Sequence, residues 1–428
     1  MIAGRGVRVA AGAAMLLCAA PAAFAASEPN DPGYAQQWGL KSLRVSQAWD
    51  ATRGGGVIVA VIDTGVDSHH PDLAGRVLAG RDFVDDDDDA SDSKGHGTHV
   101  AGTIGATAGN GVGIASVAPN AKILPVRVLG ADGEGDPGDV AAGIDWAVAR
   151  GARVVNLSLA QDDHLPIPGE TLLRDTRVDR AIRDAARGGA VVIVAAGNDD
   201  EGGKAQTAYD ATVAGVLVVG ATTRGDERAA YANYGDGLDV VAPGGGSATD
   251  PKACGDPNWI VSTWWNPQSK KSDYGGGCGT SMAVAHVSGI AAMLIARGYS
   301  AAGAAQRIID TAVDLGPAGF DVETGYGRVD AFGAVGSAPR TASPRPSASP
   351  TAVPSATTQG GLSGAGTPSA SPSPTLSVDP TNGPRASAPA APRGSRRGAP
   401  VGVAAVLVLV LMGAHSKVRA RPPAAPRL

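Results

Sequence analysis

Continuous runs of Val, Ile, Leu and Ala recur between residues 27 and 337, and amphipathic stretches separate them. The runs "GVIVAVID", "ARVVNLSLA", "GAVVIVAAGN" and "GVLVVGAT" are typical of strands that are buried on both faces. Between them lie stretches such as "PGDVAAGIDWAVARG", in which Pro137 suits a first helical turn and Gly151 follows the end. Alternation of such strands and helices predicts an α/β domain with three layers, in which helices cover both faces of a parallel sheet.

The N-terminal residues have a different pattern. Two arginines precede an apolar run, and small residues that suit cleavage follow in "AFA". This pattern predicts an export signal over residues 1–26, which would be removed together with Cys18. The remaining cysteines, Cys254 and Cys278, are an even pair in an oxidising compartment, and we expect them to form one disulfide. Two buried free thiols are the alternative.

The C-terminal fifth of the chain predicts a membrane anchor on a long tether. Residues 338–398 are rich in Pro, Ser and Ala and cannot bury enough apolar surface to order themselves, so we expect a disordered linker. Residues 399–414 are apolar or small, with basic residues on both sides, and predict a transmembrane helix, although a typical span has roughly 20 residues. With a cleaved export signal, the main domain would lie outside the cell membrane, and residues 415–428 would form a short cytoplasmic tail.

Charge narrows the classes of partner. The formal net charge is -5, and the hydrophobic residues make up 43% of the chain. A basic surplus is absent from the composition, so nucleic acid is not expected as a partner. The chain is long and apolar enough to bury one large core or two medium ones.

Residues of catalytic types stand at the ends of the predicted elements. Asp63 and Asn198 end apolar strands, His96 opens a helix after a loop, and Ser281 opens the apolar helix "AVAHVSGIAAMLIARG". A hydroxyl nucleophile needs a base, the base needs an acid that fixes its tautomer, and the oxyanion needs donors. Chemistry in parallel sheets gathers at the carboxyl ends of the strands. We therefore predict a site in which the Ser281 N–H and the Asn198 amide hold the oxyanion.

The two histidines of "GHGTH" also allow a zinc site. His96 and His99 are three residues apart and could share one face of a helix. However, the sequence offers no third ligand motif and no glutamate between the two histidines. The catalytic interpretation of His96 is therefore favoured.

Together, these motifs resemble a known family. "VIDTGVD", "GHGTHVAGT" and "GTSMA", in this order, resemble the three signatures of the subtilisin-like serine proteases, and "AAGN" resembles their oxyanion segment. The resemblance spans about residues 31–335. It implies a subtilisin-like fold and an endopeptidase for protein or peptide substrates that forms an acyl-enzyme and needs no cofactor for catalysis. Its catalytic residues would be the acid Asp63, the base His96, the nucleophile Ser281 and the oxyanion donor Asn198.

The resemblance also implies two substrate-binding segments. "VNLSLA" is similar to the strand that borders the specificity pocket and places there Ser158, Leu159 and Ala160, with an alanine where the family usually has glycine. "DGEGD" is similar to the edge strand that pairs with extended substrate, and places there Gly133, Glu134 and Gly135. The acids of this segment would favour basic substrate residues upstream of the cut, or would form a solvated rim without selectivity.

Two structural calcium sites are implied as well. The first resembles the family's calcium site, with side chains of Asp31, Asp72 and Asn110 and backbone carbonyls near Val112 and Ile114. The second resembles a calcium loop of the thermitase branch in the acidic run "RDFVDDDDDASD", with ligands Asp82, Asp85, Asp87 and Asp89. A solvated, self-repelling loop is the alternative for this run.

The order of the segments resembles one branch of the family. An export signal, a short arm, a subtilase domain, a Pro-rich tether and a C-terminal anchor resemble the mycosins, membrane proteases associated with type VII secretion. The arm before Asp63 is too short for the inhibitory pro-domain that is common in subtilisins, so we expect no such pro-domain. Two alternatives stay open: a subtilase-fold structural subunit of a secretion complex, and a general scavenging protease tethered to the cell envelope.

Overall fold

The computed structural model describes residues 28–159, 175–199 and 213–336. The predicted signal, linker, anchor and tail lie outside these residues, as does Ala160, and those assignments remain predictions. Within the described residues, we find no helix whose length and apolar character would let it span a bilayer.

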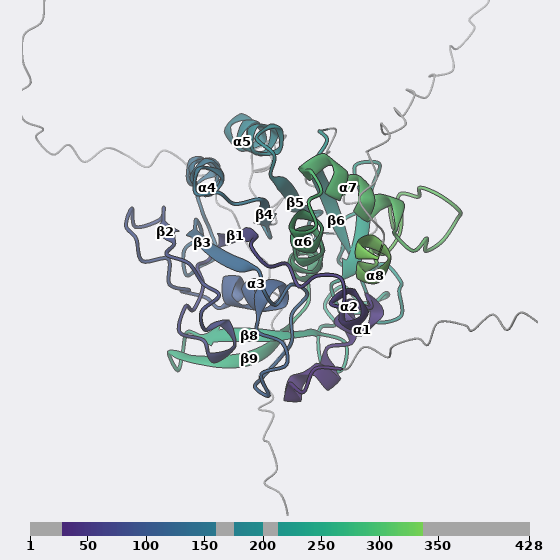
Figure 1. The fold of residues 1–428 in the computed structure, drawn as a ribbon, viewed down its shortest axis with the longest axis horizontal. Helices are drawn as coiled ribbons and strands as arrows, with labels where there is room; N and C mark the ends of the chain where they lie inside the picture. The colour runs from purple at the N-terminus through teal and green to yellow at the C-terminus, as the bar shows by residue number, and fades with distance from the viewer. Residues whose placement is uncertain (1–27, 160–174, 200–212, 337–428) are drawn as a thin grey trace, which may run out of the picture. The chain divides into compact units, whose positions relative to one another are not determined.

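A seven-stranded sheet is the centre of the described structure (Figure 1). The strand order is β2-β3-β1-β4-β5-β6-β7, and every pairing between neighbours is parallel. Each predicted apolar run forms one of the inner strands. The strands are β1 (Ile58–Asp63), β2 (Arg81–Asp82), β3 (Lys122–Arg127), β4 (Val154–Leu157), β5 (Val191–Ala195), β6 (Val216–Thr222) and β7 (Val240–Pro243).

Helices cover both faces of this sheet, which confirms the predicted three layers (Figure 1). The helices of one face are α3 (His96–Gly105), α6 (Thr280–Ala296), α7 (Ala301–Asp310) and α8 (Ala331–Val335). Those of the other face are α4 (Pro137–Ala149) and α5 (Thr176–Arg187). Successive side chains of a strand point to opposite faces. Accordingly, Val59 and Val61 of β1 lie in the core with α3 and α6, whereas Ala60 and Ile62 lie in the core with α4 and α5.

An antiparallel hairpin lies outside the central sheet and packs on α3 (Figure 1). It consists of β8 (Ile260–Asn266) and β9 (Lys271–Gly277). The segment between β7 and α6 also contains a disulfide between Cys254 and Cys278, as predicted. Because Cys278 is three residues before Ser281, this disulfide ties the approach to α6 to the preceding loop.

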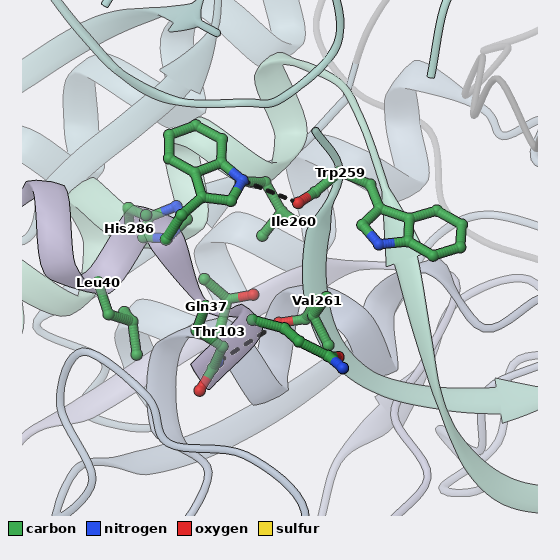
Figure 2. A pocket seen from close by; sticks show the side chains of 10 residues that line it. Gln37, Leu40, Thr103, Trp259, Ile260, Val261 and His286 are labelled. Atoms are coloured by element: carbon green, nitrogen blue, oxygen red, sulfur yellow. Dashed lines mark hydrogen bonds between the residues drawn. The ribbon is translucent and has the colours of Figure 1, made fainter. Parts of the chain in front are cut away.

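A short N-terminal arm is built into the same side of the fold. It contains the 3-10 helix η1 (Pro32–Gln36) and the helices α1 (Trp38–Ser42) and α2 (Val45–Ala48). The Gln37 amide donates to the Ala115 carbonyl at 2.8 Å, and the indole of Trp38 donates to the Trp259 carbonyl at 3.0 Å. Figure 2 shows Gln37 beside Val261 and His286, around a cavity of about 10 Å³. That volume accommodates about one water molecule.

Candidate active site

Asp63 and His96 form the centre of the site. Asp63 is the last residue of β1, His96 is the first residue of α3, and both are fully buried. His96 Nδ1 lies 2.7 Å from Oδ1 and 2.9 Å from Oδ2 of Asp63. A carboxylate accepts only, so Nδ1 carries the hydrogen and Nε2 is the basic atom. Within the described part of the chain, His96 Nε2 is buried without a hydrogen-bond partner.

The buried carboxylate of Asp92 sets the position of His96. It accepts hydrogen bonds from the Gly95 N–H at 2.7 Å, the Thr98 N–H at 2.8 Å and the Thr64 hydroxyl at 2.8 Å. The Thr64 hydroxyl in turn accepts from the Gly97 N–H at 3.0 Å. These bonds satisfy N–H groups at the start of α3 that have no partner within the helix. Burial raises the pKa of Asp92 above its usual value, and the hydrogen bonds from Thr98, Gly95 and Lys94 only partly oppose this rise.

Gly95, immediately before His96, has no room for a side chain. Its φ is +102°, and an added Cβ would lie 2.4 Å from the Trp265 carbonyl and 2.7 Å from the Trp264 ring. The hairpin therefore closes directly over the start of α3. Of its two tryptophans, Trp264 packs here and against His99, while Trp265 lines a neighbouring pocket of about 410 Å³.

Ser281 is the second residue of α6 and is buried. Its hydroxyl donates to the Ser158 carbonyl at 3.2 Å, so the hydrogen bond to His96 is not formed in this rotamer. The register pairs Ile62 with Leu157, so Ser158 lies beside Asp63 at the carboxyl ends of adjacent strands. The structure thus brings Ser281 to the predicted edge of the sheet, and a change of rotamer must precede proton transfer.

Asn198 is oriented by the residue before the nucleophile. It follows β5 by three residues, and its Oδ1 accepts from the Thr280 N–H at 2.9 Å and the Thr280 hydroxyl at 3.0 Å. The NH₂ group of Asn198 is thereby left to donate elsewhere. The Ser281 N–H, at the start of α6, has no acceptor within the helix. These two donors match the predicted oxyanion site.

The zinc alternative has no support in the geometry. His99 lies in α3, and its Nε2 is 2.9 Å from the Ile260 carbonyl, a bond in which the ring nitrogen donates. Burial lowers the pKa of His99 to about 3. His286, behind the nucleophile in α6, is also buried, and burial lowers its pKa to about 4. Both rings are therefore neutral structural groups.

The predicted substrate segments are only partly described. Ser158 and Leu159 are buried at the end of β4. No strand forms at Gly133, Glu134 and Gly135. The Gly130 N–H instead donates to the Glu134 carbonyl at 2.8 Å and closes a turn. An edge strand there was predicted, and the structure shows a loop. Because an edge strand gains its hydrogen bonds only from a partner, pairing with substrate would have to create it.

The first predicted calcium site comes together in space. The Asp31 carboxylate accepts from the Gly109 N–H at 2.7 Å and the Asn110 N–H at 3.0 Å, and the Asn110 side-chain amide donates to Asp72 at 2.9 Å. Asp31 and Asp72 are both buried, and neither forms an ion pair with a described residue. Burial raises the pKa of Asp72. Two buried carboxylates without a cationic partner suit a calcium ion. The Asn110 amide, however, turns its NH₂ toward Asp72, and its oxygen accepts from the Val112 N–H at 2.8 Å.

The carbonyls expected to complete this site lie in the loop after α3. Those of Val112 and Ile114 accept no hydrogen bond from the described part of the chain, while the Ile114 N–H donates to Asp72 at 2.8 Å. The residues present therefore offer both carboxylate and carbonyl oxygens.

The second predicted calcium site is different. Arg127 pairs with Asp82 and, at 2.7 Å, with Asp85. Asp89 accepts from the Ser91 hydroxyl at 2.6 Å, and the Asp87 carboxylate accepts from the Asp89 N–H at 2.8 Å. Among described residues, no group of three Asp, Glu, His or Cys side chains is arranged to hold a metal ion. The convergence of four carboxylates predicted for this loop is therefore not seen, because a guanidinium occupies part of it.

Sequence reasoning missed several residues that support the site. The sequence places Asp92 only within the acidic run, and it predicts no role for Thr64 or Asn156. The Asn156 amide donates to the Ser158 hydroxyl at 2.8 Å and its oxygen accepts from the Ser288 hydroxyl at 2.9 Å, so β4 is bonded to α6. One signal was available: a polar Asn inside an apolar strand must find a buried partner.

The site combines a buried carboxylate–imidazole pair, a serine at a helix N-terminus and two oxyanion donors, all on a parallel α/β sheet. These features define a serine hydrolase with an Asp-His-Ser triad. Comparison with known proteins agrees and is more specific. Residues 54–327 match the Subtilase family of peptidases, so the chain belongs to this family and is a serine endopeptidase.

Individual relatives cover the same region. Thermitase of Thermoactinomyces vulgaris is 38% identical over 308 residues, which are 72% of this chain and 99% of thermitase. A thermophilic serine proteinase from a Bacillus species is 41% identical over 73% of this chain and 70% of its own. Among solved structures, a protease of Pseudoalteromonas arctica is 34% identical with a TM-score of 0.62, over 72% of this chain and 99% of that one.

Proposed function

We propose that this protein is a membrane-anchored endopeptidase that cleaves exported proteins on the outer side of the cell membrane. The observation that carries the chemistry is the buried contact of 2.7 Å between His96 Nδ1 and Asp63, which leaves His96 Nε2 as the base. The location is supported by the sequence alone, through the export pattern of residues 1–26 and the apolar residues 399–414.

Catalysis begins when the Ser281 hydroxyl leaves the Ser158 carbonyl and turns toward His96. The Ser281 oxygen attacks the substrate carbonyl carbon while its proton passes to His96 Nε2, and Asp63 stabilises the imidazolium. The Ser281 N–H and the Asn198 NH₂ hold the oxyanion, and each such donor is worth roughly 3 kcal/mol of barrier. The C–N bond then breaks as His96 protonates the amine, and water hydrolyses the acyl-enzyme by the same steps.

A direct test uses the full chain in membranes. A fluorophosphonate probe should label wild-type protein, and the labelled peptide should contain Ser281. Ser281→Ala is the control that removes the nucleophile alone. Deletion of residues 399–428 should move the labelled protein from the membrane fraction to the soluble fraction. Labelling of another residue would contradict the triad, and membrane retention of the truncated protein would contradict the anchor.

The order of segments also supports a mycosin-like role at a type VII secretion system. The alternatives are a structural subunit of that system and a scavenging protease. Ser281→Ala in the host separates these roles. Export that stops with this variant supports proteolysis of a secreted substrate, whereas export that continues unless the whole protein is removed supports a structural role. Unaffected export together with rapid casein digestion by the wild type supports scavenging.

We also propose that calcium binds at Asp31, Asp72 and Asn110, with the carbonyls of Val112 and Ile114. The ion would supply a positive charge between two buried carboxylates and hold the N-terminal arm on the loop after α3. No catalytic step requires it.

A further inference from the structure

The edge of the sheet opposite the catalytic residues carries a cluster of cations. The seven strands are parallel, so their amino ends form one edge and their carboxyl ends form the other. Asp63 lies at the carboxyl end of β1, a strand that spans roughly 20 Å. Loops that lead into the amino ends of the strands are therefore remote from the active site.

Three arginines share a narrow part of this amino-terminal edge. The loops before β1 and β3 meet where the Asn120 N–H donates to the Arg53 carbonyl at 2.9 Å. The loops before β1 and β4 meet where the Arg153 N–H donates to the Ile58 carbonyl at 3.0 Å, and Arg150 ends α4 just before this loop. Because β3, β1 and β4 are neighbours at a spacing of about 4.8 Å, these arginines lie close together.

No described carboxylate neutralises these charges. Arg53, Arg150 and Arg153 are exposed, and none of them forms an ion pair with a described residue. Arg76 and Lys122, half-buried beside them, donate to uncharged oxygens. We call these five residues the basic edge. The formal net charge of the whole chain is -5, so the basic edge is a positive surface on an acidic protein.

Helix ends and nearby acids offset only part of this charge. Arg150 caps α4, and Arg153 donates to the Gly189 carbonyl at 3.2 Å, just after α5. Each helix C-terminus carries only about half a negative charge. Asp50 and Asp145 are exposed nearby in the chain, but neither forms an ion pair with a described residue. The basic edge therefore retains a positive surplus.

Aromatic rings hold two of the arginines. The guanidinium carbon of Arg53 lies 5.0 Å from the centre of the Trp49 ring, and that of Arg150 lies 4.8 Å from the centre of the Trp146 ring. Stacking on a ring uses none of the N–H groups, so each planar fork stays available to a ligand. Such a fork binds two phosphate oxygens at once. The basic edge therefore fits a layer of phosphate groups.

We propose that the basic edge rests on the phosphodiester headgroups of anionic phospholipids. The choice of this partner rests on the proposed membrane anchor. A flexible linker of about 60 residues has an end-to-end distance of roughly 45 Å, so residues 338–398 would keep the domain close to a bilayer. Attraction that is weak for a free protein then acts at a high effective concentration. The catalytic edge faces away from the lipid, toward proteins outside the membrane.

The test uses the full chain in lipid nanodiscs. Hydrogen–deuterium exchange is compared between nanodiscs of phosphatidylcholine alone and nanodiscs that also contain phosphatidylglycerol. We expect the amides of residues 54–56 and 150–153 to exchange more slowly when phosphatidylglycerol is present. Sodium chloride at about 0.5 M should abolish this protection, because it screens exposed charges. This comparison within the wild-type protein does not depend on any variant.

A triple variant then tests the named arginines. Each arginine near an anionic surface should contribute about fivefold to the equilibrium constant for docking. Arg53→Gln, Arg150→Gln and Arg153→Gln together should therefore lower this constant about 100-fold and remove the protection. Denaturant unfolding of the variant checks that the domain remains folded.

The matched control combines Lys41→Gln, Lys270→Gln and Lys271→Gln. These lysines are exposed, none forms an ion pair with a described residue, and they lie in α1 and at the turn between β8 and β9. The control should keep the protection. If it loses the protection to the same extent as the arginine variant, net charge alone drives the attraction, and the basic edge is not the docking surface.

Three further results separate the proposals. A full chain that stays in the membrane fraction without any lipid-dependent protection rejects the docking and leaves the anchor in place. A full chain that leaves phosphatidylcholine vesicles rejects the anchor, and its failure to sediment with phosphatidylglycerol vesicles would then reject the docking as well. Equal protection by soluble polyglutamate, added to nanodiscs of phosphatidylcholine, would overturn the assignment to lipid in favour of an acidic protein partner.

Discussion

Ser158 and Ser281 are joined by two reciprocal hydrogen bonds. The Ser281 hydroxyl donates to the Ser158 carbonyl at 3.2 Å, and the Ser158 hydroxyl donates to the Ser281 carbonyl at 3.1 Å. One bond holds the nucleophile in its resting rotamer, while the other fixes the backbone of α6 relative to β4. Since only the first must break for attack, the helix can stay in place as the hydroxyl turns.

Ser158→Ala should weaken this junction without removing the nucleophile. The Asn156 amide and the Ser281 carbonyl would lose a buried partner, so we expect a loss of roughly 1–3 kcal/mol in the free energy of unfolding. Denaturant unfolding measures this loss. Ser288→Ala is the control, because it breaks the Asn156 network but leaves Ser281 bonded. If Ser288→Ala lowered kcat more than Ser158→Ala did, the hydrogen bonds between Ser158 and Ser281 would not be what holds the nucleophile in position.

Asp63→Asn should lower kcat by about 10⁴-fold while the protein stays folded, because an amide cannot hold the imidazolium or fix the tautomer in the same way. Rates at saturating peptide measure the effect. The double variant with Ser281→Ala should be no slower than Ser281→Ala alone, since the two residues act as one unit. Additive losses would show that Asp63 acts separately from Ser281.

Gly95→Ala should destabilise the site more than a substitution at a comparable glycine. Gly75 also has a left-handed backbone, with φ of +71°, but an added Cβ there meets no atom within 4 Å. Gly75→Ala should therefore cost about 1 kcal/mol from backbone strain. Gly95→Ala should cost a further 1–3 kcal/mol or so, because Trp264 and Trp265 must move. Equal unfolding midpoints for the two variants would mean that the hairpin does not close on Gly95.

Stability should fall as the solution becomes acidic. The pKa values of His99 and His286 are lowered to about 3 and about 4 in the folded state, below the usual value of 6.5. Between these values and pH 6.5, the unfolded chain takes up protons that the folded protein does not. Each histidine therefore lowers the free energy of unfolding by about 1.4 kcal/mol for each unit by which the pH falls. Above pH 6.5 these histidines are mainly neutral in both the folded and the unfolded chain, so this loss of stability is absent.

His286→Gln should make the pH dependence of unfolding less steep between pH 6.5 and pH 4. Denaturant unfolding at several pH values measures the slope, and His69→Gln at the exposed surface serves as the control. A slope that does not change with His286→Gln would show that another group dominates acid unfolding.

Removal of calcium should lower the melting temperature if the first calcium site is filled. A ligand at 100 times its dissociation constant stabilises by about 2.7 kcal/mol, and chelation should remove this stabilisation. Asp72→Asn should abolish the response to calcium, whereas Asp87→Asn, in the acidic loop, should preserve it. The reverse result would transfer the calcium site to the acidic loop.

The layers of the fold could be predicted because the inner strands are continuous apolar runs, and the triad could be predicted because its residues stand at the ends of elements. The supporting contacts could not, since they join positions that only the folded chain brings together. Register places Asp82 opposite Arg127, which explains why the acidic loop is neutralised in part by an arginine from the next strand. Asp92 likewise gains its role only when α3 begins beside it.

The alternation of β1 between two cores ties catalytic competence to correct folding. If β1 shifted by one position, Val59 and Val61 would exchange sides with Ala60 and Ile62, and Asp63 would leave His96. A slipped strand would therefore yield a chain that is badly packed and unable to cut. A protease that misfolds in this way poses no proteolytic danger to its neighbours.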